Sequence, residues 1–222
     1  MSDQPVKQKR TVWDLPTRVF HWSLVAMVGL AWVSAEFDGF FFWLHVVFGE
    51  AVIALVVFRL VWGFIGGRYA RFFDFVAGPA AVKAHLGSLL TRTPHHVPGH
   101  NPAAGWMILV LLAVSFATSF AGLFLIEDGY IGPLARYGNL DDDPHEALAD
   151  ILVFLIGLHV AAAVLMSLLM GENLIRAMWT GKKTGTDDAA PTTGAPVEAP
   201  LWRAGLAALI GLAAAIFPFF MG

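Results

Sequence analysis

The sequence predicts an all-α integral membrane protein, with a bundle of four transmembrane helices and one extra C-terminal transmembrane helix. Three observations predict this fold class. Of the 222 residues, 57% are hydrophobic and only 14% are charged, which is far more apolar than a soluble domain. Five apolar stretches approach the roughly 20 residues that a helix needs to cross the hydrocarbon core of a membrane. No alternating pattern is long enough to predict a strand.

The five expected spans are residues 19–35, 40–65, 103–126, 146–170 and 204–220. The first span follows Arg18 and can also be read as a cleaved signal peptide, but Phe20, Trp22 and Trp32 are bulkier than the apolar region of such a peptide. The two tryptophans suit anchors at a membrane interface. We therefore expect this segment to remain in the protein as a transmembrane helix.

Lysine and arginine residues predict how the chain is oriented in the membrane. They gather before the first span, between the second and third, and between the fourth and fifth, at Lys7, Lys9, Arg10, Arg18, Arg68, Arg71, Lys83, Arg92, Arg176, Lys182, Lys183 and Arg203. The connections at 36–39 and 127–144 are acidic, and Arg136 is their one basic residue. Because loops rich in Lys and Arg stay in the cytoplasm, we expect a cytoplasmic N-terminus and, after five spans, a periplasmic C-terminus.

Composition divides the chain into four segments. Residues 1–18 are expected to form a cytoplasmic N-terminal segment, 19–182 the four-helix bundle, 183–202 a flexible linker and 203–222 the C-terminal transmembrane helix. The run TGTDDAAPTTGAPVEAP at 184–200 is rich in Gly, Pro, Thr and acidic residues, as flexible linkers are. We expect this linker to detach the last span from the bundle.

Composition also excludes several classes of function. The absence of cysteine excludes disulfides, iron–sulfur clusters, thiolate zinc sites and covalent haem attachment. The net charge of -3 and the lack of a basic arm with interleaved aromatic residues exclude nucleic-acid binding. No nucleophile motif such as GxSxG is present.

Four histidines lie in or near the expected spans, at His21, His45, His145 and His159. An ionisable side chain at membrane depth marks a functional site by default, although a single such histidine is more often a hydrogen-bonded packing residue. Between His145 and His159 a helix turns through about 1400° and rises about 21 Å, so both residues lie on nearly one face. Because histidine is the standard axial ligand of haem iron, one helix can ligate two stacked haems.

The expected topology pairs these histidines by depth. His45 lies near the outer end of its span, and the span of His145 begins on the outer side. His21 lies near the inner end of its span, and His159 reaches the inner half of its own. We therefore expect His45 with His145 for an outer haem and His21 with His159 for an inner haem.

Two further residues share the face of His45. Gly49 lies one turn further on and leaves room for a macrocycle, and Arg59 lies at the level of the inner haem. Arg59 can pair with a haem propionate or with a quinone oxygen, or its side chain can simply extend to the inner interface.

The run PHHVPGHNP at 94–102 contains three further histidines and suggests a metal site by composition alone. No carboxylate lies nearby in the sequence, and the three prolines predict a stiff, irregular connector. A role in lining an inner quinone site stays open for this run.

A combination of motifs points to a known family. The motifs are WDLPTRVFHW at 13–22, LHVVFGE at 44–50, FRLVWGFIGGRYARF at 58–72 and GHNPAAGW at 99–106, together with the pair of His145 and His159. This combination resembles the bacterial cytochrome b561 family, which includes the b-type cytochrome subunit of nickel-iron hydrogenases. The likeness covers about residues 11–182. It implies four transmembrane helices that hold two b haems by bis-histidine ligation, with His21, His45, His145 and His159 as the ligands.

The resemblance also implies a function in the bacterial inner membrane. Family members pass electrons between the quinone pool, ubiquinone or menaquinone, and a periplasmic redox partner. The motifs do not show whether the partner is a hydrogenase, a c-type cytochrome or superoxide. They also do not show whether the chain is an electron-transfer protein or a subunit of an oxidoreductase. The fifth span departs from the four-span pattern and is expected to be an anchor or a partner-docking helix. Two other functions stay open: a haem-free transporter or proton relay, and a structural anchor for a periplasmic enzyme.

Acidic residues supply the remaining candidates. We expect the loop at 141–143 to dock the periplasmic partner. Proton release from a quinol needs a nearby acceptor, and Glu50, Glu127 and Asp150 are unranked candidates for it. With both axial positions filled by imidazole, we expect outer-sphere electron transfer rather than oxygenation.

Overall fold

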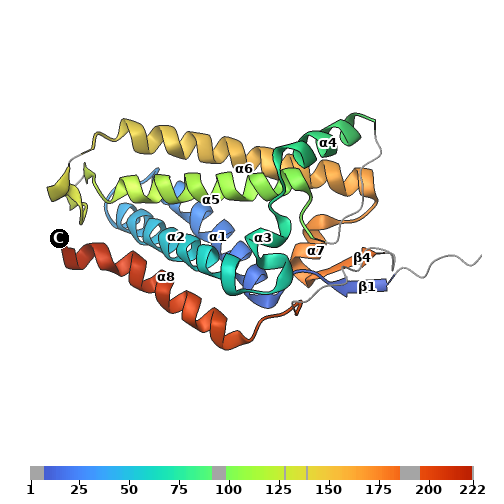
Figure 1. Cartoon of the computed structure of the whole chain (residues 1–222). Helices are drawn as coiled ribbons and strands as arrows, with labels where there is room; N and C mark the ends of the chain where they lie inside the picture. Colours follow the sequence, from blue (N-terminus) through green and yellow to red (C-terminus); the bar gives the residue numbers. More distant parts are fainter. Residues whose placement is uncertain (1–7, 92–98, 128, 139, 186–195, 222) are drawn as a thin grey trace, which may run out of the picture.

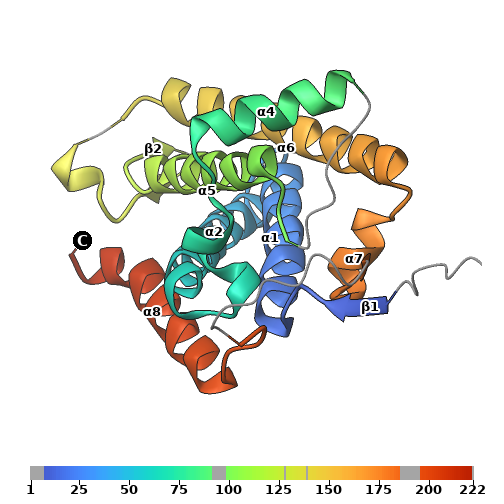
Figure 2. The ribbon, with the colours of Figure 1, turned by 45° about the vertical axis from the view of Figure 1, so that its right-hand side comes forward.

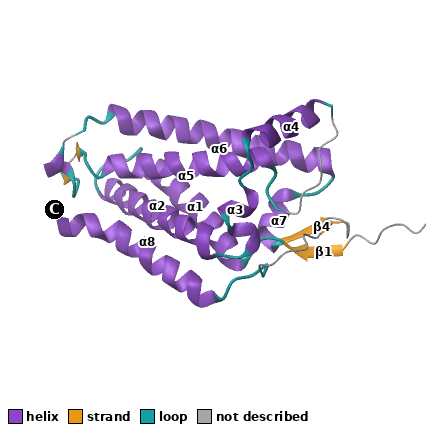
Figure 3. Ribbon diagram, viewed as in Figure 1, coloured by secondary structure: helices purple, strands orange, loops and turns teal. Residues whose placement is uncertain are grey.

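The computed structural model describes residues 8–91, 99–127, 129–138, 140–185 and 196–221. Helices make up most of this part of the chain, as Figure 3 shows, and four of them are long and apolar enough to cross a membrane. The predicted fold class, an all-α membrane bundle with an additional C-terminal helix, is therefore confirmed.

Five long helices form the bundle, and successive ones run in opposite directions (Figure 1). They are α1 (Leu15–Ser34), α2 (Phe40–Ile65), α5 (Pro102–Gly122), α6 (Asp143–Met170) and α8 (Leu201–Met221). The shorter elements lie at the ends of the bundle and comprise the helices η1 (Arg68–Ala70), α3 (Phe72–Phe75), α4 (Pro79–Leu90), η2 (Ala135–Tyr137) and α7 (Leu174–Thr180), and the strands β1 (Gln8–Thr11), β2 (Ile126–Glu127), β3 (Tyr130–Ile131) and β4 (Lys182–Gly185).

The two ends of the bundle differ in charge. One end carries β1, β4, α3, α4 and α7 with basic residues such as Arg68, Arg176 and Lys182, and we call it the basic end. The other end carries β2, β3, η2 and the acidic connections at 36–39 and 140–143, and we call it the acidic end. In Figure 1 the basic end is on the right and the acidic end on the left.

Side-chain caps determine where α1 and α5 begin. Asp14 Oδ1 accepts a hydrogen bond from Thr17 N at 2.9 Å, and Asn101 Oδ1 accepts one from Ala104 N at 2.8 Å. In each helix a proline lies in the first turn, where its missing N–H removes no helical hydrogen bond. α1 therefore begins at Leu15, four residues before the expected start of the first span.

Four of the five expected spans meet the requirements of length and composition within the described residues, namely α2, α5, α6 and α8. α1 has 20 residues and packs against α2, but Arg18 and His21 make it less apolar than the other four. That α1 also crosses the membrane stays a prediction.

The buried core lies where α1, α2 and α5 meet α3. Its buried members are Phe20, Val52, Val56, Phe72, Phe75 and Leu112. Elsewhere the long helices expose large apolar side chains, for example Phe154 at 70% and Leu168 at 76%. An apolar surface of this extent suits contact with lipid.

α8 packs along α2, on the side of the bundle away from α6 (Figures 1 and 2). Ala207, Gly211 and Ala215 are buried in α8 and recur every four residues, which lets two helix backbones approach closely. At the basic end, Arg203 Nη1 donates a hydrogen bond to the Ile65 carbonyl at 3.3 Å. The expectation that the linker detaches this helix from the bundle is wrong, because this stripe of small residues gives α8 a packing face.

A short ribbon of two strands lies at the basic end. β1 pairs antiparallel with β4, so that Gln8 lies opposite Gly185 and Thr11 opposite Lys182. The sequence does not predict this ribbon, since four residues carry too little alternation. The ribbon includes the start of the expected linker at 183–202, whose residues 186–195 lie outside the described part of the chain.

Replacing Gly211 with leucine is expected to push α8 away from α2 and to destabilise the protein. A Cβ at this position would collide with the carbonyl oxygen of Ala54, a backbone atom that cannot turn aside. Overpacking of this kind costs about 1–3 kcal/mol, which thermal unfolding of the purified protein in detergent measures. Gly205→Leu is the matched control, because a Cβ there meets nothing within 4 Å and the gain in helix propensity is the same. Equal melting temperatures for the two variants would contradict the packing of α8.

Candidate functional site

At the acidic end, His45 of α2 and His145 of α6 lie next to each other. Their ring centroids are 5.9 Å apart, and the ring planes meet at 81°. His45 Nδ1 lies 2.9 Å from the carbonyl oxygen of Ala31, and His145 Nδ1 lies 2.9 Å from that of Thr118. Because a carbonyl oxygen only accepts hydrogen bonds, each Nδ1 donates one, and this arrangement leaves Nε2 as the ring nitrogen that can bind a metal ion.

This geometry fits two imidazoles that share one metal ion. A metal ion bound between the two rings would be held by both imidazoles, because a bond from a metal to an imidazole nitrogen is about 2 Å long. A hydrogen bond from the other ring nitrogen to a backbone carbonyl is how proteins fix the orientation of a metal-binding imidazole. The rings of His45 and His145 lie next to each other, and each makes such a hydrogen bond.

At the basic end, His21 of α1 and His159 of α6 lie within electrostatic reach of each other. The ring of His21 meets the Trp22 ring edge-on, with 5.0 Å between centroids, and its Nδ1 is buried without a hydrogen-bond partner among the described residues. α6 therefore supplies one histidine to each pair, as the fourteen-residue spacing of His145 and His159 predicts. Ligation of haem by these four residues stays a prediction.

α6 makes few contacts with the helices that carry the partner histidines. α6 packs against α5 and α7, whereas its contacts with α1 and α2 are few. Within α6, Leu152 and Met166 are the buried residues. A Cβ at Gly49, one turn from His45 on α2, would meet nothing within 4 Å. An unfilled position of this kind beside a histidine pair fits a flat macrocycle.

Arg59 lies deep in the bundle near its basic end. It is 2% exposed, and its Nη1 has no hydrogen-bond partner among the described residues. The guanidinium carbon lies 4.8 Å from the ring centroid of Phe72 and 5.8 Å from that of Phe75. Gly63 makes room for this arrangement, because a Cβ there would collide with the Phe72 ring. Arg59 is therefore buried against α3, and its role towards a haem propionate or a quinone stays a prediction.

His100 lies close to Arg59. The sequence does not predict where this histidine lies. Its ring lies between those of Trp13 and Phe75, with centroid separations of 4.4 and 4.6 Å. Its Nδ1 is buried without a hydrogen-bond partner among the described residues. Burial, followed by the positive charges of Arg59 and Lys183, holds the pKa of His100 well below its usual range. His100 is therefore a neutral imidazole at physiological pH.

A further polar group lies at the acidic end. Both carboxylate oxygens of Glu50 are buried without a hydrogen-bond partner among the described residues. Burial, with a smaller contribution from Glu50, raises the pKa of Tyr130 to about 12, so Tyr130 is a neutral phenol at physiological pH. Of the three carboxylates considered for proton uptake, Asp150 is exposed, and the side chain of Glu127 lies outside the described part. Glu50 is thus the candidate whose carboxylate oxygens are buried.

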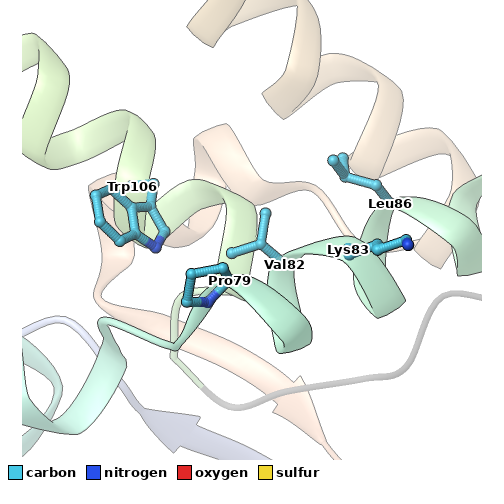
Figure 4. Close-up of a pocket in the computed structure, with 5 residues that line it drawn as sticks. All are labelled: Pro79, Val82, Lys83, Leu86 and Trp106. Carbon is cyan, nitrogen blue, oxygen red and sulfur yellow. The ribbon is translucent and has the colours of Figure 1, made fainter.

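An apolar depression lies elsewhere, between α4 and the start of α5 (Figure 4). None of its lining residues is a predicted site residue; they are Pro79, Val82, Lys83, Leu86 and Trp106. His95 and His96, which suggested a metal site by composition, lie outside the described residues. Within the described part, no group of three or more His, Cys, Asp or Glu residues could hold a metal ion. A bis-histidine site requires only two protein ligands, so the two histidine pairs are the candidate site.

A membrane helix bundle with paired histidines and no cysteine corresponds to the way in which b-type cytochromes hold haem, by axial imidazoles without a covalent link. The fold and the candidate site thus define a membrane b-type cytochrome. The family model of prokaryotic cytochrome b561 matches residues 12–181, which is more than half of the chain. The chain belongs to the prokaryotic cytochrome b561 family. Comparisons with curated proteins and with solved structures find no match.

Proposed function

We propose that this protein is a di-haem cytochrome b that passes electrons across the membrane between the quinone pool and a periplasmic redox partner. The observation that carries the proposal is the placement of His145 and His159 on one helix, each near a histidine of another helix. Their separation of about 21 Å along α6 covers most of a hydrocarbon core of about 30 Å. Redox groups at these two depths connect the two sides of the membrane.

The proposed axial ligands are His45 with His145 at the acidic end and His21 with His159 at the basic end. Bound haem supplies reversible one-electron chemistry, and two imidazoles per iron leave no position for a substrate. The part played by the chain is to hold the imidazoles in place and to exclude water from them.

Neighbouring residues support these roles. The carbonyl oxygens of Ala31 and Thr118 fix the rings of the acidic-end pair. Gly49 leaves room beside His45, and Arg59 places a buried positive charge near the basic-end pair. That charge suits an oxygen acceptor, which a haem propionate or a quinone can supply.

We propose that the basic end faces the cytoplasm and the acidic end the periplasm, because basic loops are retained inside. The residues at 141–143 are exposed and acidic, and they suit a basic face on a hydrogenase or a c-type cytochrome. Superoxide is the third candidate partner. Glu50, buried near the same end, is the group that takes up a proton if a quinol is oxidised there.

The haem content of the purified protein tests the proposed function. We expect two haems b per chain and a b-type α band that appears when a quinol reduces the protein. No α band with dithionite, when haem is supplied during expression, would contradict the proposal and favour a haem-free proton relay. A haem that dithionite reduces, but that quinol, hydrogen with a hydrogenase, and superoxide all leave oxidised, would favour a structural anchor.

A further inference from the structure

Three aromatic rings with a cationic side chain at each end form one continuous stack at the basic end. The stack, which we call the basic stack, consists of Arg59, Phe75, His100, Trp13 and Lys183. Arg59 Cζ lies 5.8 Å from the Phe75 centroid, the rings of Phe75 and His100 are 4.6 Å apart, those of His100 and Trp13 are 4.4 Å apart, and Lys183 Nζ lies 5.5 Å from the Trp13 centroid. Five separate segments of the chain contribute one residue each.

Backbone contacts hold the basic stack in place. Lys183 Nζ donates a hydrogen bond to the carbonyl of Gly99 at 3.0 Å. Gly99 lies against the ring of Tyr69, because a Cβ there would come within 3.0 Å of that ring. Directly after His100, Asn101 caps α5 through its side chain. The position of His100 is therefore determined from both sides.

Two buried nitrogens of the basic stack have no hydrogen-bond partner among the described residues, namely Arg59 Nη1, which is a donor, and His100 Nδ1, which is a donor in one of its two neutral tautomers. Arg59 interacts electrostatically with Asp14, but Asp14 Oδ2 also lacks a hydrogen-bond partner, so direct contact does not neutralise the guanidinium. A buried charge without a close counterion is costly unless a ligand supplies one. The donors therefore indicate an anionic acceptor at this place.

The acceptor lies near the basic-end histidine pair. His100 is within electrostatic reach of both His21 and His159, as well as of Arg59. The group expected between those two histidines is a haem, which carries two propionate carboxylates. Guanidinium and carboxylate form the strongest class of hydrogen bond available here. A quinone carbonyl accepts the same bonds but is neutral, and it would leave the charge of Arg59 uncompensated.

We propose that Arg59 and His100 bind the propionate carboxylates of the basic-end haem and thereby set its position and its reduction potential. This inference rests on the proposed function and adds His100 to the residues of the site. Lys183 acts as a positioning residue, because its hydrogen bond to Gly99 fixes the residue before His100. Reduction adds an electron to the haem, so a fixed positive charge beside it favours the reduced form.

Midpoint potentials of the purified two-haem protein test this inference. Arg59→Gln is expected to lower the midpoint potential of the basic-end haem by at least about 59 mV, which is a tenfold change in the reduction equilibrium for one electron. The potential of the acidic-end haem is expected to stay unchanged. Arg59→Lys keeps the charge and is expected to restore most of the potential. Arg176→Gln is the matched control, because it removes an exposed charge from the same end. Equal potentials in wild type and Arg59→Gln would overturn the inference.

His100→Leu is the second variant, and it serves as the test if Arg59→Gln does not fold. It is expected to lower the same potential. Protein loaded with haem whose propionates are methyl esters separates the two sources of an acceptor. With esterified haem, we expect the effect of His100→Leu to disappear, whereas Arg59→Gln keeps only the effect of removing a charge near the haem. A difference that persists with esterified haem and depends on added ubiquinone would assign the donors to a quinone instead. If the variants keep two haems and their midpoint potentials equal those of wild type, this inference alone is overturned. If the protein binds no haem, the proposed function is overturned.

Discussion

Replacing His159 with alanine is expected to lower the haem content from two haems per chain to one. Alanine removes one axial ligand of the basic-end pair and leaves His45 and His145, with their hydrogen bonds to Ala31 and Thr118, untouched. Because about 21 Å of helix separates His159 from His145, loss at one end does not disturb ligation at the other. Haem per chain, measured from the pyridine haemochrome spectrum, gives the result.

The reciprocal variant, His145→Ala, is expected to lose the acidic-end haem and to keep the other. The haem that remains in each variant then assigns the two midpoint potentials to the two ends. Leu158→Ala is the control for the change in side-chain size, because Leu158 adjoins His159 but is 46% exposed. Two haems in both histidine variants would show that neither residue is a ligand, and the pairing of α6 with α1 and α2 would lose its functional meaning.

The histidine pairs could be predicted from the sequence because an uninterrupted helix converts spacing into geometry. Fourteen residues fix both the angle and the rise between His145 and His159, whatever packs around them. The partners of these two residues require the topology as well, which the distribution of Lys and Arg supplies. His45 beside His145 follows from two helices that run in the same direction, each with a histidine near its N-terminal end.

His100 could not be placed in this way, because it lies in an irregular connection. Its position depends on Trp13, on Phe75 and on the β4 residue Lys183, which are remote in the sequence. A signal is nonetheless present: Asn101 followed by a proline is a helix start, and it fixes the residue just before it. Asp14 plays the same role for Trp13 at the start of α1.

The packing of α8 could not be predicted from the linker before it. The composition of a linker rich in Gly and Pro indicates a flexible connection between two elements, and it carries no information on where the second element packs. The information lies in α8 itself, in the four-residue recurrence of Ala207, Gly211 and Ala215. Small residues at this spacing indicate a helix–helix contact in a membrane, where lipid offers no hydrophobic drive for association.

Filling the open position at Gly49 is expected to remove the acidic-end haem without unfolding the protein. A leucine side chain there would meet no protein atom within 4 Å of its Cβ, and it improves helix propensity by about 1 kcal/mol. It would instead occupy the space one turn from His45 on the same face, where a macrocycle ligated by His45 and His145 has to lie. Haem per chain is therefore expected to fall from two to one, while thermal stability of the haem-free protein stays equal or rises.

Gly157→Leu is the matched control for this change. Gly157 lies in α6, is exposed, and likewise has no atom within 4 Å of the place that a Cβ would take, so the same substitution is made at a second open position, on another helix and two residues from His159. We expect Gly157→Leu to keep both haems, because its side chain would extend towards lipid. If Gly49→Leu also keeps both, the open position at Gly49 faces lipid too, and the acidic-end haem must lie on another side of His45.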